Sequence, residues 1–368
     1  MPQFYYEYFN QQDQQFGDEK RNTLDFDFQH DIALTEDNYF NWGLGYRYVA
    51  SSLFDSTYVT ADPTHQNLHL VSAFVQDKAA FFDNTVLLTL GAKVQYYTLS
   101  GWDYQPTVRL LWKFHPEHRV WAAFSRATRS PSRGETALSL KPQQVPERFS
   151  PFPISFDFAG NPALEQEHVL SYELGYRGWV GNRLSFDLAI FYNDYDNLVT
   201  GYNVPPDVSN PQISFTFENG ASAQTWGFEM ATDWHLLDSL RLQLSYSFLQ
   251  VNYHNFNFSD EPKPNNDPEN QVSFRGSYDI TPTITFDTWV RYVDSISSIN
   301  ALFSPQYTID SYVGLDLRLA WKPIHNLELS IVGQNINNST HLEYVEEIFA
   351  YPRQVERSIY GKIKWHFK

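Results

Sequence analysis

Apolar residues recur at every second position along most of this chain. The alternation is clear in the segment 183–193, where one side of the run is apolar: Leu184, Phe186, Leu188, Ile190 and Tyr192. Successive side chains of a β-strand point to opposite faces, so such a run predicts a strand with one apolar and one mixed face. The same period recurs in 86–95, 240–248 and 313–321, and no segment shows a convincing helical period. The chain is therefore expected to be all-β.

The alternating runs predict sixteen strands, most of them more than ten residues long. Their predicted bounds are 3–12, 20–34, 39–52, 66–80, 85–98, 104–114, 119–128, 167–179, 183–198, 223–236, 240–253, 270–280, 283–297, 311–322, 327–340 and 355–368. Strands of globular proteins usually have about 5–6 residues, whereas a tilted strand needs about 9–11 residues to cross the hydrocarbon layer of a membrane. The predicted lengths favour strands that span a membrane.

The predicted connections alternate between tight turns and long loops, with 99–103 as the main exception. The tight turns are 35–38, 81–84, 115–118, 180–182, 237–239, 281–282 and 323–326. The long loops are 53–65, 129–166, 199–222, 254–269, 298–310 and 341–354. An up-and-down meander with short turns at one rim and long loops at the other is the layout of an outer-membrane barrel. We therefore expect an antiparallel, up-and-down transmembrane β-barrel.

Composition excludes several classes of protein. The formal net charge of −17 argues against a nucleic-acid partner, which would require a basic face. The absence of cysteine excludes a disulfide scaffold and thiolate chemistry. The chain contains no run of 18 apolar residues, so no transmembrane helix is predicted. Aromatic residues make up 17% of the chain, which suits the aromatic girdles of a barrel at the two membrane interfaces.

Charged residues occupy the mixed face of several predicted strands. They include Lys93, Asp187, Glu229, Arg241, Asp316 and Arg318. An unpaired charge in a dry core costs several kcal/mol, but it costs little where it lines a wet or plugged lumen. A soluble β-rich binding module with an aromatic core is the alternative interpretation.

The last strand carries a terminal pattern. Ile363, Trp365 and Phe367 alternate with Lys362, Lys364 and other polar residues. This resembles the closing strand of bacterial outer-membrane barrels, although Lys368 follows the aromatic residue that ends the usual pattern. The resemblance implies the barrel-assembly machinery and outer-membrane lipid as partners.

Residues 121–135 read WAAFSRATRSPSRGE. This segment resembles the central barrel segment of TonB-dependent outer-membrane receptors, and the matching positions are Ser125, Arg126, Ala127, Arg129 and Pro131. Further segments resemble later elements of that family, in the family's order. They are the Asn-Pro box at Asn161 and Pro162, the strand end 189–199, the element with Gly227 and Glu229, and the penultimate strand in 331–344.

This resemblance implies a barrel of about 22 strands whose lumen is plugged by an N-terminal domain. Residues 1–368 are then expected to be a partial barrel that lacks the signal, the TonB box, the plug and the first strands. The implied function is energised import of a scarce, bulky ligand, foremost a ferric siderophore, across the outer membrane of a Gram-negative bacterium. TonB would act only through the missing N-terminal region. A passive porin is the alternative, because sixteen strands also form porins.

Arg126, Arg129 and Arg133 are the candidate contact residues at the start of the long loop. They would meet an anionic ligand such as a ferric chelate, or they would pair with acids of a plug, as charges inside membrane proteins usually do. The loop 131–166 is rich in proline and phenylalanine and is the longest of the outer loops. We expect it to contact the ligand.

No catalytic motif is present, so no enzyme is expected. No histidine lies between Pro131 and Pro162, which argues against haem in a receptor of this family, and no other cofactor is indicated. His115 and His118 flank a predicted turn, but no third ligand is apparent, so no metal site is predicted there. The acidic stretch 257–270 lacks a regular spacing of calcium ligands.

Overall fold

The computed structural model describes residues 1–13, 17–144, 155–204, 212–255, 267–298, 307–344 and 354–367. Sixteen long strands form one sheet, and each pairs antiparallel with the next long strand. They are β1 (Pro2–Gln11), β2 (Glu19–Thr35), β3 (Asn38–Leu53), β5 (His65–Phe81), β6 (Val86–Tyr97), β7 (Gly101–His115), β8 (His118–Arg129), β11 (Glu167–Val180), β12 (Leu184–Val204), β13 (Gln212–Leu237), β14 (Leu240–His254), β15 (Asn270–Thr281), β16 (Ile284–Val293), β19 (Tyr312–Ile324), β20 (Leu327–Gln334) and β23 (Ser358–Trp365). The prediction of sixteen antiparallel strands is confirmed.

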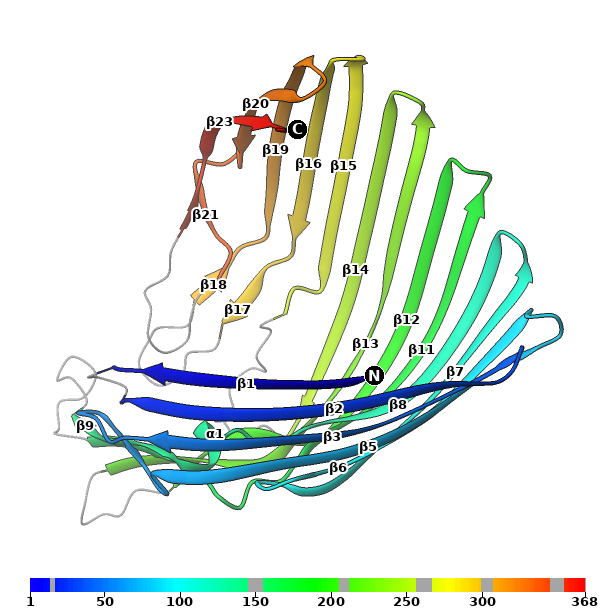
Figure 1. Cartoon of the computed structure of the whole chain (residues 1–368). Helices are drawn as coiled ribbons and strands as arrows, with labels where there is room; N and C mark the ends of the chain where they lie inside the picture. Colours follow the sequence, from blue (N-terminus) through cyan, green and yellow to red (C-terminus); the bar gives the residue numbers. More distant parts are fainter. Residues whose placement is uncertain are drawn as a thin grey trace.

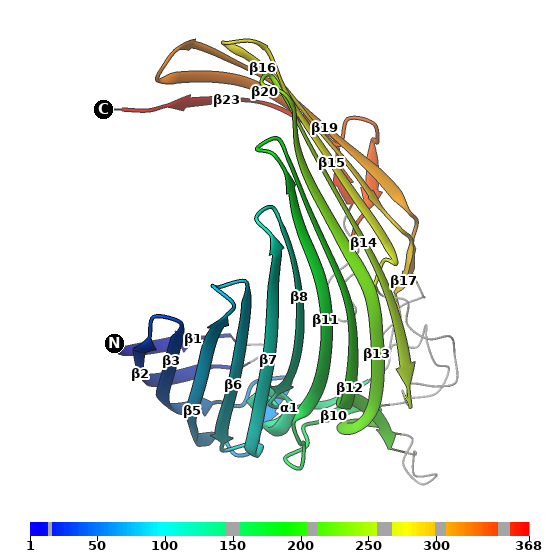
Figure 2. The ribbon, with the colours of Figure 1, turned by 90° about the vertical axis from the view of Figure 1, so that its right-hand side faces the viewer.

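The sheet curves into an open wall rather than a closed cylinder (Figure 1, Figure 2). In the described part of the chain, β1 pairs only with β2 and β23 pairs only with β20. Figure 2 shows these two edge strands on opposite arms of the curve, with the open side between them. Both edges therefore leave a row of backbone hydrogen-bonding groups free for another strand.

The connections separate by length as predicted. Tight turns join β2 to β3, β5 to β6, β7 to β8, β11 to β12, β13 to β14, β15 to β16 and β19 to β20. The longer connections lie at the opposite ends of the strands, which we call the loop rim; the ends with tight turns form the turn rim. The exception is the short link 98–100 between β6 and β7, which lies at the loop rim. Outer-membrane barrels place short turns on the periplasmic side and long loops outside the cell.

The two faces of the wall differ in chemistry as the alternation predicts. Large apolar side chains are exposed on the outer face, among them Leu174, Ile190, Leu244, Leu319 and Ile331. Hollows on the inner face are lined by residues that include Asp187, Glu229, Arg241, Asp316 and Arg318. No second layer of the described chain covers the face that carries Leu184, Leu242 and Leu315 (Figure 2). This arrangement does not fit a soluble sandwich.

The loop rim has a small structure of its own. The chain after β8 forms a short helix, α1 (Arg133–Ala137), and then β9 (Leu138–Gln144), which pairs antiparallel with β4 (Val59–Ala61) and with β10 (Ser155–Ala159). β10 in turn pairs parallel with the extended start of β13. These elements were not predicted, because their partners are distant in sequence. The described residues contain no helix that is long and apolar enough to span a membrane.

Several predicted strand bounds were wrong at the loop rim. β16 ends at Val293, and β17 (Ile296–Ser298) pairs instead with β18 (Tyr307–Ile309). β20 ends at Gln334, because Asn335 has a φ of 51° that interrupts the extended backbone. A second short hairpin follows, formed by β21 (Thr340–Leu342) and β22 (Gln354–Glu356).

Candidate functional site

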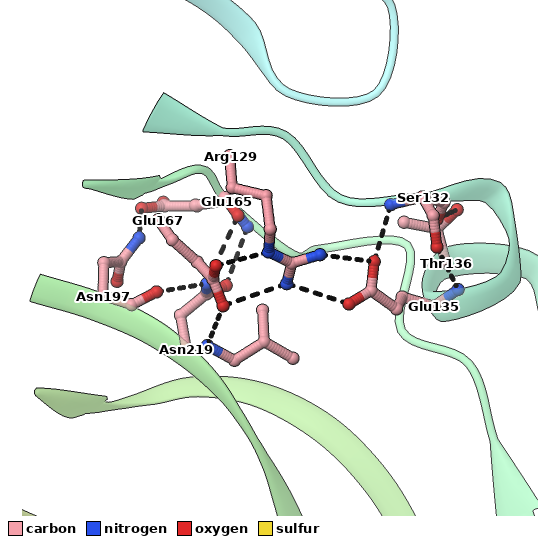
Figure 3. Close-up of polar contacts among 9 residues, drawn as sticks. Arg129, Ser132, Glu135, Thr136, Glu165, Glu167, Asn197 and Asn219 are labelled. Carbon is pink, nitrogen blue, oxygen red and sulfur yellow. Dashed lines mark hydrogen bonds and ion pairs between the residues drawn. The ribbon is translucent and has the colours of Figure 1, made fainter. Parts of the chain in front are cut away.

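Arg129, the last residue of β8, joins the two ends of the long loop (Figure 3). Its guanidinium group donates to both carboxylate oxygens of Glu135 in α1, at 2.9 and 3.2 Å. It also pairs with both oxygens of Glu167, the first residue of β11, one of them at 2.9 Å. Bidentate pairs of this kind fix geometry as well as charge. Arg129 therefore clamps α1 against the start of β11.

The helix held by this clamp begins with a capping box. The Ser132 hydroxyl accepts from the Glu135 backbone N–H at 3.2 Å, and the Glu135 carboxylate accepts from the Ser132 N–H at 2.7 Å. These bonds satisfy donors that a helix start leaves free. Pro131, which precedes the cap, is fully buried and sets the direction in which the chain leaves β8. The motif Ser-Arg-Ala-Thr-Arg-Ser-Pro thus ends a strand and starts a docked helix.

The Asn-Pro box holds the other end of the loop. Asn161 Nδ2 donates to the Phe217 carbonyl at 2.8 Å, and Asn161 Oδ1 accepts from the Ala163 N–H at 2.9 Å. The Asn161 N–H donates to the Glu135 carbonyl at 2.9 Å, so the box also contacts α1. Pro162 is exposed beside these contacts. The box and the first motif therefore form one polar network.

Two asparagines in family-like segments, to which the sequence alone gave no role, complete this network (Figure 3). Asn219 of β13 accepts from the Glu165 N–H at 2.8 Å and donates to the Asn197 carbonyl at 2.8 Å. Asn197 has a φ of 62° at a bulge in β12, and its side chain donates to the Gln166 carbonyl at 2.8 Å. Asparagine tolerates this left-handed conformation better than most residues. Asn197 lies in the strand end 189–199, and Asn219 with Gly220 precedes the element with Gly227, so the signal for both was the resemblance of these segments to the family.

Arg126 is held by a separate set of groups. Its guanidinium group lies 2.7 Å from an Asp103 oxygen and 2.9 Å from His168 Nδ1, and it sits over the Tyr104 ring at 4.3 Å. The side chain of Asp103 is fully buried and also accepts from Gln105 and Thr128. Arg126 therefore neutralises a buried carboxylate. Ser125 and Ala127, its neighbours in the motif, pair with Ser171 and Val169 of β11.

Arg133 is buried without an acidic partner and is only 9% exposed. It donates to the Ser51 hydroxyl at 2.6 Å and to the carbonyls of Pro63 and Thr64 at 2.5 and 2.8 Å. Burial lowers the pKa of Arg133 from its ordinary value, although an arginine stays charged at neutral pH. This residue anchors α1 to β3 and to the loop before β5.

A hollow of about 780 Å³ opens on the inner face near the loop rim. Its lining includes Arg21, Arg47, Arg133 and Glu7, together with Pro131 and several apolar residues of β3 and β5. Arg21 and Arg47 keep 37% and 48% of their side chains exposed. The hollow therefore offers exposed cations to a bulky anionic ligand. The part of the expected contact loop between 145 and 154 lies outside the described residues.

The other predicted positions lie away from this hollow. Gly227 is buried in β13, where a Cβ atom would stand 2.0 Å from the Phe248 carbonyl oxygen, so the close approach requires glycine. Glu229 lines a different hollow, of about 510 Å³, beside Trp289 and Arg291. Ile363 and Trp365 lie on the edge strand β23 and Phe367 lies just beyond it; all three are more than half exposed.

Comparison with known proteins places the chain in a family. Residues 2–336 match the family described as TonB dependent receptor-like, beta-barrel, and the chain belongs to this family. Members of this family are outer-membrane β-barrel proteins of Gram-negative bacteria, and this localisation holds for the chain. Its relatives are receptors and transporters rather than enzymes.

Two curated relatives show the level of similarity. The Ferrioxamine B receptor of Salmonella typhimurium is 27% identical over 198 residues, which cover 51% of this chain and 26% of that protein. The Iron-regulated outer membrane virulence protein of Vibrio cholerae is 23% identical over 205 residues, which cover 54% of this chain and 30% of that protein.

Solved structures agree on the fold. The siderophore receptor PirA from Acinetobacter baumannii superimposes with a TM-score of 0.73 at 15% identity, over 95% of this chain and 55% of that chain. The FrpB iron transporter from Neisseria meningitidis gives a TM-score of 0.69 at 13% identity, over 95% and 55%. The 368 residues therefore span about half the length of these receptors.

Proposed function

We propose that this chain forms most of the barrel wall of a receptor that imports a ferric siderophore across the outer membrane. The observation that carries the proposal is the hollow at the loop rim, because it is large and polar and exposes Arg21 and Arg47 toward the lumen. Ferric chelates are bulky and commonly anionic, so exposed guanidinium groups suit them. The names of the relatives, a ferrioxamine receptor and a siderophore receptor among them, support the same ligand class.

The three arginines of the motif have a different role in this proposal. Arg126, Arg129 and Arg133 each have partners within the chain, which are acids, a hydroxyl and carbonyl groups. Arg126 and Arg133 are largely buried, and Arg129 is held by two carboxylates at once. Arg21 and Arg47 differ, because each pairs with a single acid, Glu19 or Asp25, and remains exposed. We assign them to positioning the loop over the hollow rather than to contact with the ligand or with a plug.

The rest of the receptor is also part of the proposal. The unpaired edges at β1 and β23 cannot face lipid, because each orphan backbone group there costs several kcal/mol. We propose that strands outside these 368 residues complete the wall, and that a plug and a TonB-binding segment outside them provide coupled import. The open edges weigh against a closed sixteen-stranded porin.

The test of the ligand class uses the full-length receptor in outer-membrane vesicles, with radioactive iron carried by ferrioxamine B or by ferric enterobactin. We expect saturable binding of at least one of these ferric siderophores. We expect the combined change Arg21→Ala and Arg47→Ala to weaken binding of the anionic ferric enterobactin about tenfold or more, from the loss of charge-assisted contacts. Arg183→Ala at the turn rim is the matched control. Failure to bind any ferric chelate would overturn the proposal.

The porin alternative has its own test. The 368-residue chain is reconstituted in liposomes, and swelling in neutral sugars is measured. An incomplete wall should insert poorly and give no swelling, whereas size-dependent swelling with heat-modifiable migration on a gel would support a closed sixteen-stranded pore.

A further inference from the structure

The tight turn between β7 and β8 gathers two histidines and a glutamate. His115 ends β7, His118 begins β8, and Glu117 lies in the turn between them. One ligand atom from each residue lies within 4.8 Å of the other two. Within the described residues, no other group of three histidine, aspartate or glutamate side chains comes this close. The sequence pattern indicated no third ligand beside the two histidines, but Glu117 is close enough to be one.

A β-bulge brings the two histidines together. Trp112 pairs with Val120, and a regular ladder would then place Phe114 opposite His118. The register shifts by one residue between Trp112 and His115, so His115 is opposite His118 instead. Their ring centroids are 5.0 Å apart. Bulges often re-aim a side chain in this way near functional sites.

Neighbouring groups orient His118 and Glu117. The Tyr176 hydroxyl of β11 lies 2.8 Å from His118 Nδ1, which leaves Nε2 for another partner. Gly178, which pairs with His118 across the strands, provides the space, because a Cβ there would stand 3.0 Å from His118 Nδ1. The Glu117 carbonyl accepts from the Trp179 N–H at 2.9 Å, which fixes the turn against β11. Histidines that bind metals usually have such a partner on the second ring nitrogen.

We propose that His115, Glu117 and His118 form a binding site for a divalent transition metal ion of the zinc type. Two imidazole nitrogens and a carboxylate oxygen are ligands that Zn²⁺ accepts, at about 2.0–2.2 Å, so that ligand atoms around the ion lie about 3.4 Å apart. The present spread of 4.8 Å closes to that value by side-chain rotation, because His115 is exposed and the other two residues are half-buried. The long contact of 3.2 Å from the Glu117 N–H to His115 Nδ1 is the one hydrogen bond that binding displaces.

The donor set selects the kind of ion. Nitrogen ligands disfavour Mg²⁺ and Ca²⁺, which require oxygen ligands, and favour Zn²⁺, Ni²⁺ and Cu²⁺. Water completes the coordination, because the group is at the surface. A bound ion would join the ends of β7 and β8 on the turn rim, far along the strands from the hollow described above. The site is therefore independent of the ligand that the receptor imports.

The test is a zinc titration of the untagged full-length receptor in detergent, stripped with a chelator and monitored with a competing chromophoric zinc indicator. We expect the wild type to bind one zinc equivalent at this site. His115→Ala and His118→Ala should each lower the zinc affinity of the site about 100-fold or more, so that this equivalent is no longer detected. Glu117→Gln should weaken zinc binding about tenfold, because the amide oxygen is a poorer ligand than the carboxylate. Tyr176→Phe should also weaken zinc binding about tenfold, because Tyr176 positions His118 and does not contact the ion. An excess of Mg²⁺ should not compete.

His325→Ala is the matched control, because His325 lies in the tight turn between β19 and β20 on the same rim and belongs to no group of three potential ligands among the described residues. It should leave the zinc equivalent unchanged. Heat-modifiable migration on a gel verifies that each variant is folded, and Zn²⁺ should raise the unfolding temperature of the wild type but not of the histidine variants. Equal zinc binding by the wild type and by the folded double variant of His115 and His118 would overturn the proposal.

Discussion

The polar contacts of the wall and those of the loop rim connect very different parts of the chain. On the wall, Arg241 pairs with Asp233 across one hairpin, 8 positions away in sequence. At the loop rim, Arg133 bonds Ser51, which is 82 positions away. The wall pairs follow from the register of neighbouring strands, whereas the rim contacts need several strands to be in place. Losing a rim contact should therefore release the loop and leave the wall unchanged.

The largest expected effect comes from Arg133→Met, which keeps most of the side-chain volume. The change removes three hydrogen bonds and takes from the Ser51 hydroxyl and the Pro63 carbonyl their bonds to Arg133, whereas the Thr64 carbonyl keeps its bond from the Leu53 N–H. We expect the docking of α1, β9 and β4 to weaken by about 3 kcal/mol. Hydrogen exchange of the full-length receptor in detergent measures this as faster exchange in these elements alone.

Arg183→Met is the control for that experiment. Its ion pair with Asp238 is exposed and lies at the turn rim, so its loss should change exchange very little. If Arg133→Met instead accelerated exchange throughout β3, β5 and β8, the contrast between rim and wall would be wrong.

A smaller effect is expected from acid. Burial raises the pKa of Glu135, but hydrogen bonds from Arg129 and from Ser132 lower the pKa by more than burial raises it. The pKa of Glu135 therefore lies below its ordinary value of 4.5. A carboxyl with a lowered pKa in the folded state stabilises that state above its unfolded pKa, and the effect is lost as the pH falls through the folded value.

The docking of α1 should therefore stay constant from neutral pH down to about pH 5 and weaken below about pH 4. Hydrogen exchange in α1, corrected for the intrinsic rate at each pH, measures this dependence. Glu135→Gln should dock more weakly at neutral pH and should lose the acid transition. A transition of the same size in that variant would show that another group is responsible.

The smallest effect is expected on the wall. A double-mutant cycle with Arg241→Ala and Asp233→Ala should give a coupling energy of about 0.5 kcal/mol, because both side chains remain partly exposed. Urea unfolding in lipid vesicles measures it. A coupling above about 2 kcal/mol would mean that these local pairs hold the wall together and would remove the contrast with the rim.

The sequence predicts the wall well because its information is local. Alternation and turn residues place the strand Leu240–His254 within one residue of its predicted end, and they separate turns from loops by length alone. The apolar and polar faces follow from the same period. Each of these features depends on residues that are neighbours in one strand or one hairpin.

The loop rim could not be predicted because its order comes from distant partners. β10 pairs with β13 in parallel. β9 pairs with β4, and the paired residues Thr60 and Ser139 are 79 positions apart in sequence. Resemblance identified Arg129 and the Asn-Pro box, which runs from Asn161 to Glu167, but it did not indicate that Arg129 pairs with Glu167 or that Asn161 bonds Phe217. Likewise, the bulge that aligns His115 with His118 leaves no mark in an alternating pattern.

The clamp at Arg129 also restricts the order in which the molecule can be built. A wall of hairpins can grow strand by strand, because each new strand needs only its predecessor. The clamp and its asparagines, in contrast, are complete only when β8, β11, β12 and β13 stand side by side. A network that depends on several strands is completed late, since the chain entropy lost in ordering them is repaid only at the end. The loop rim is thus the last part to mature, and its closure reports that the wall beneath it is correctly assembled.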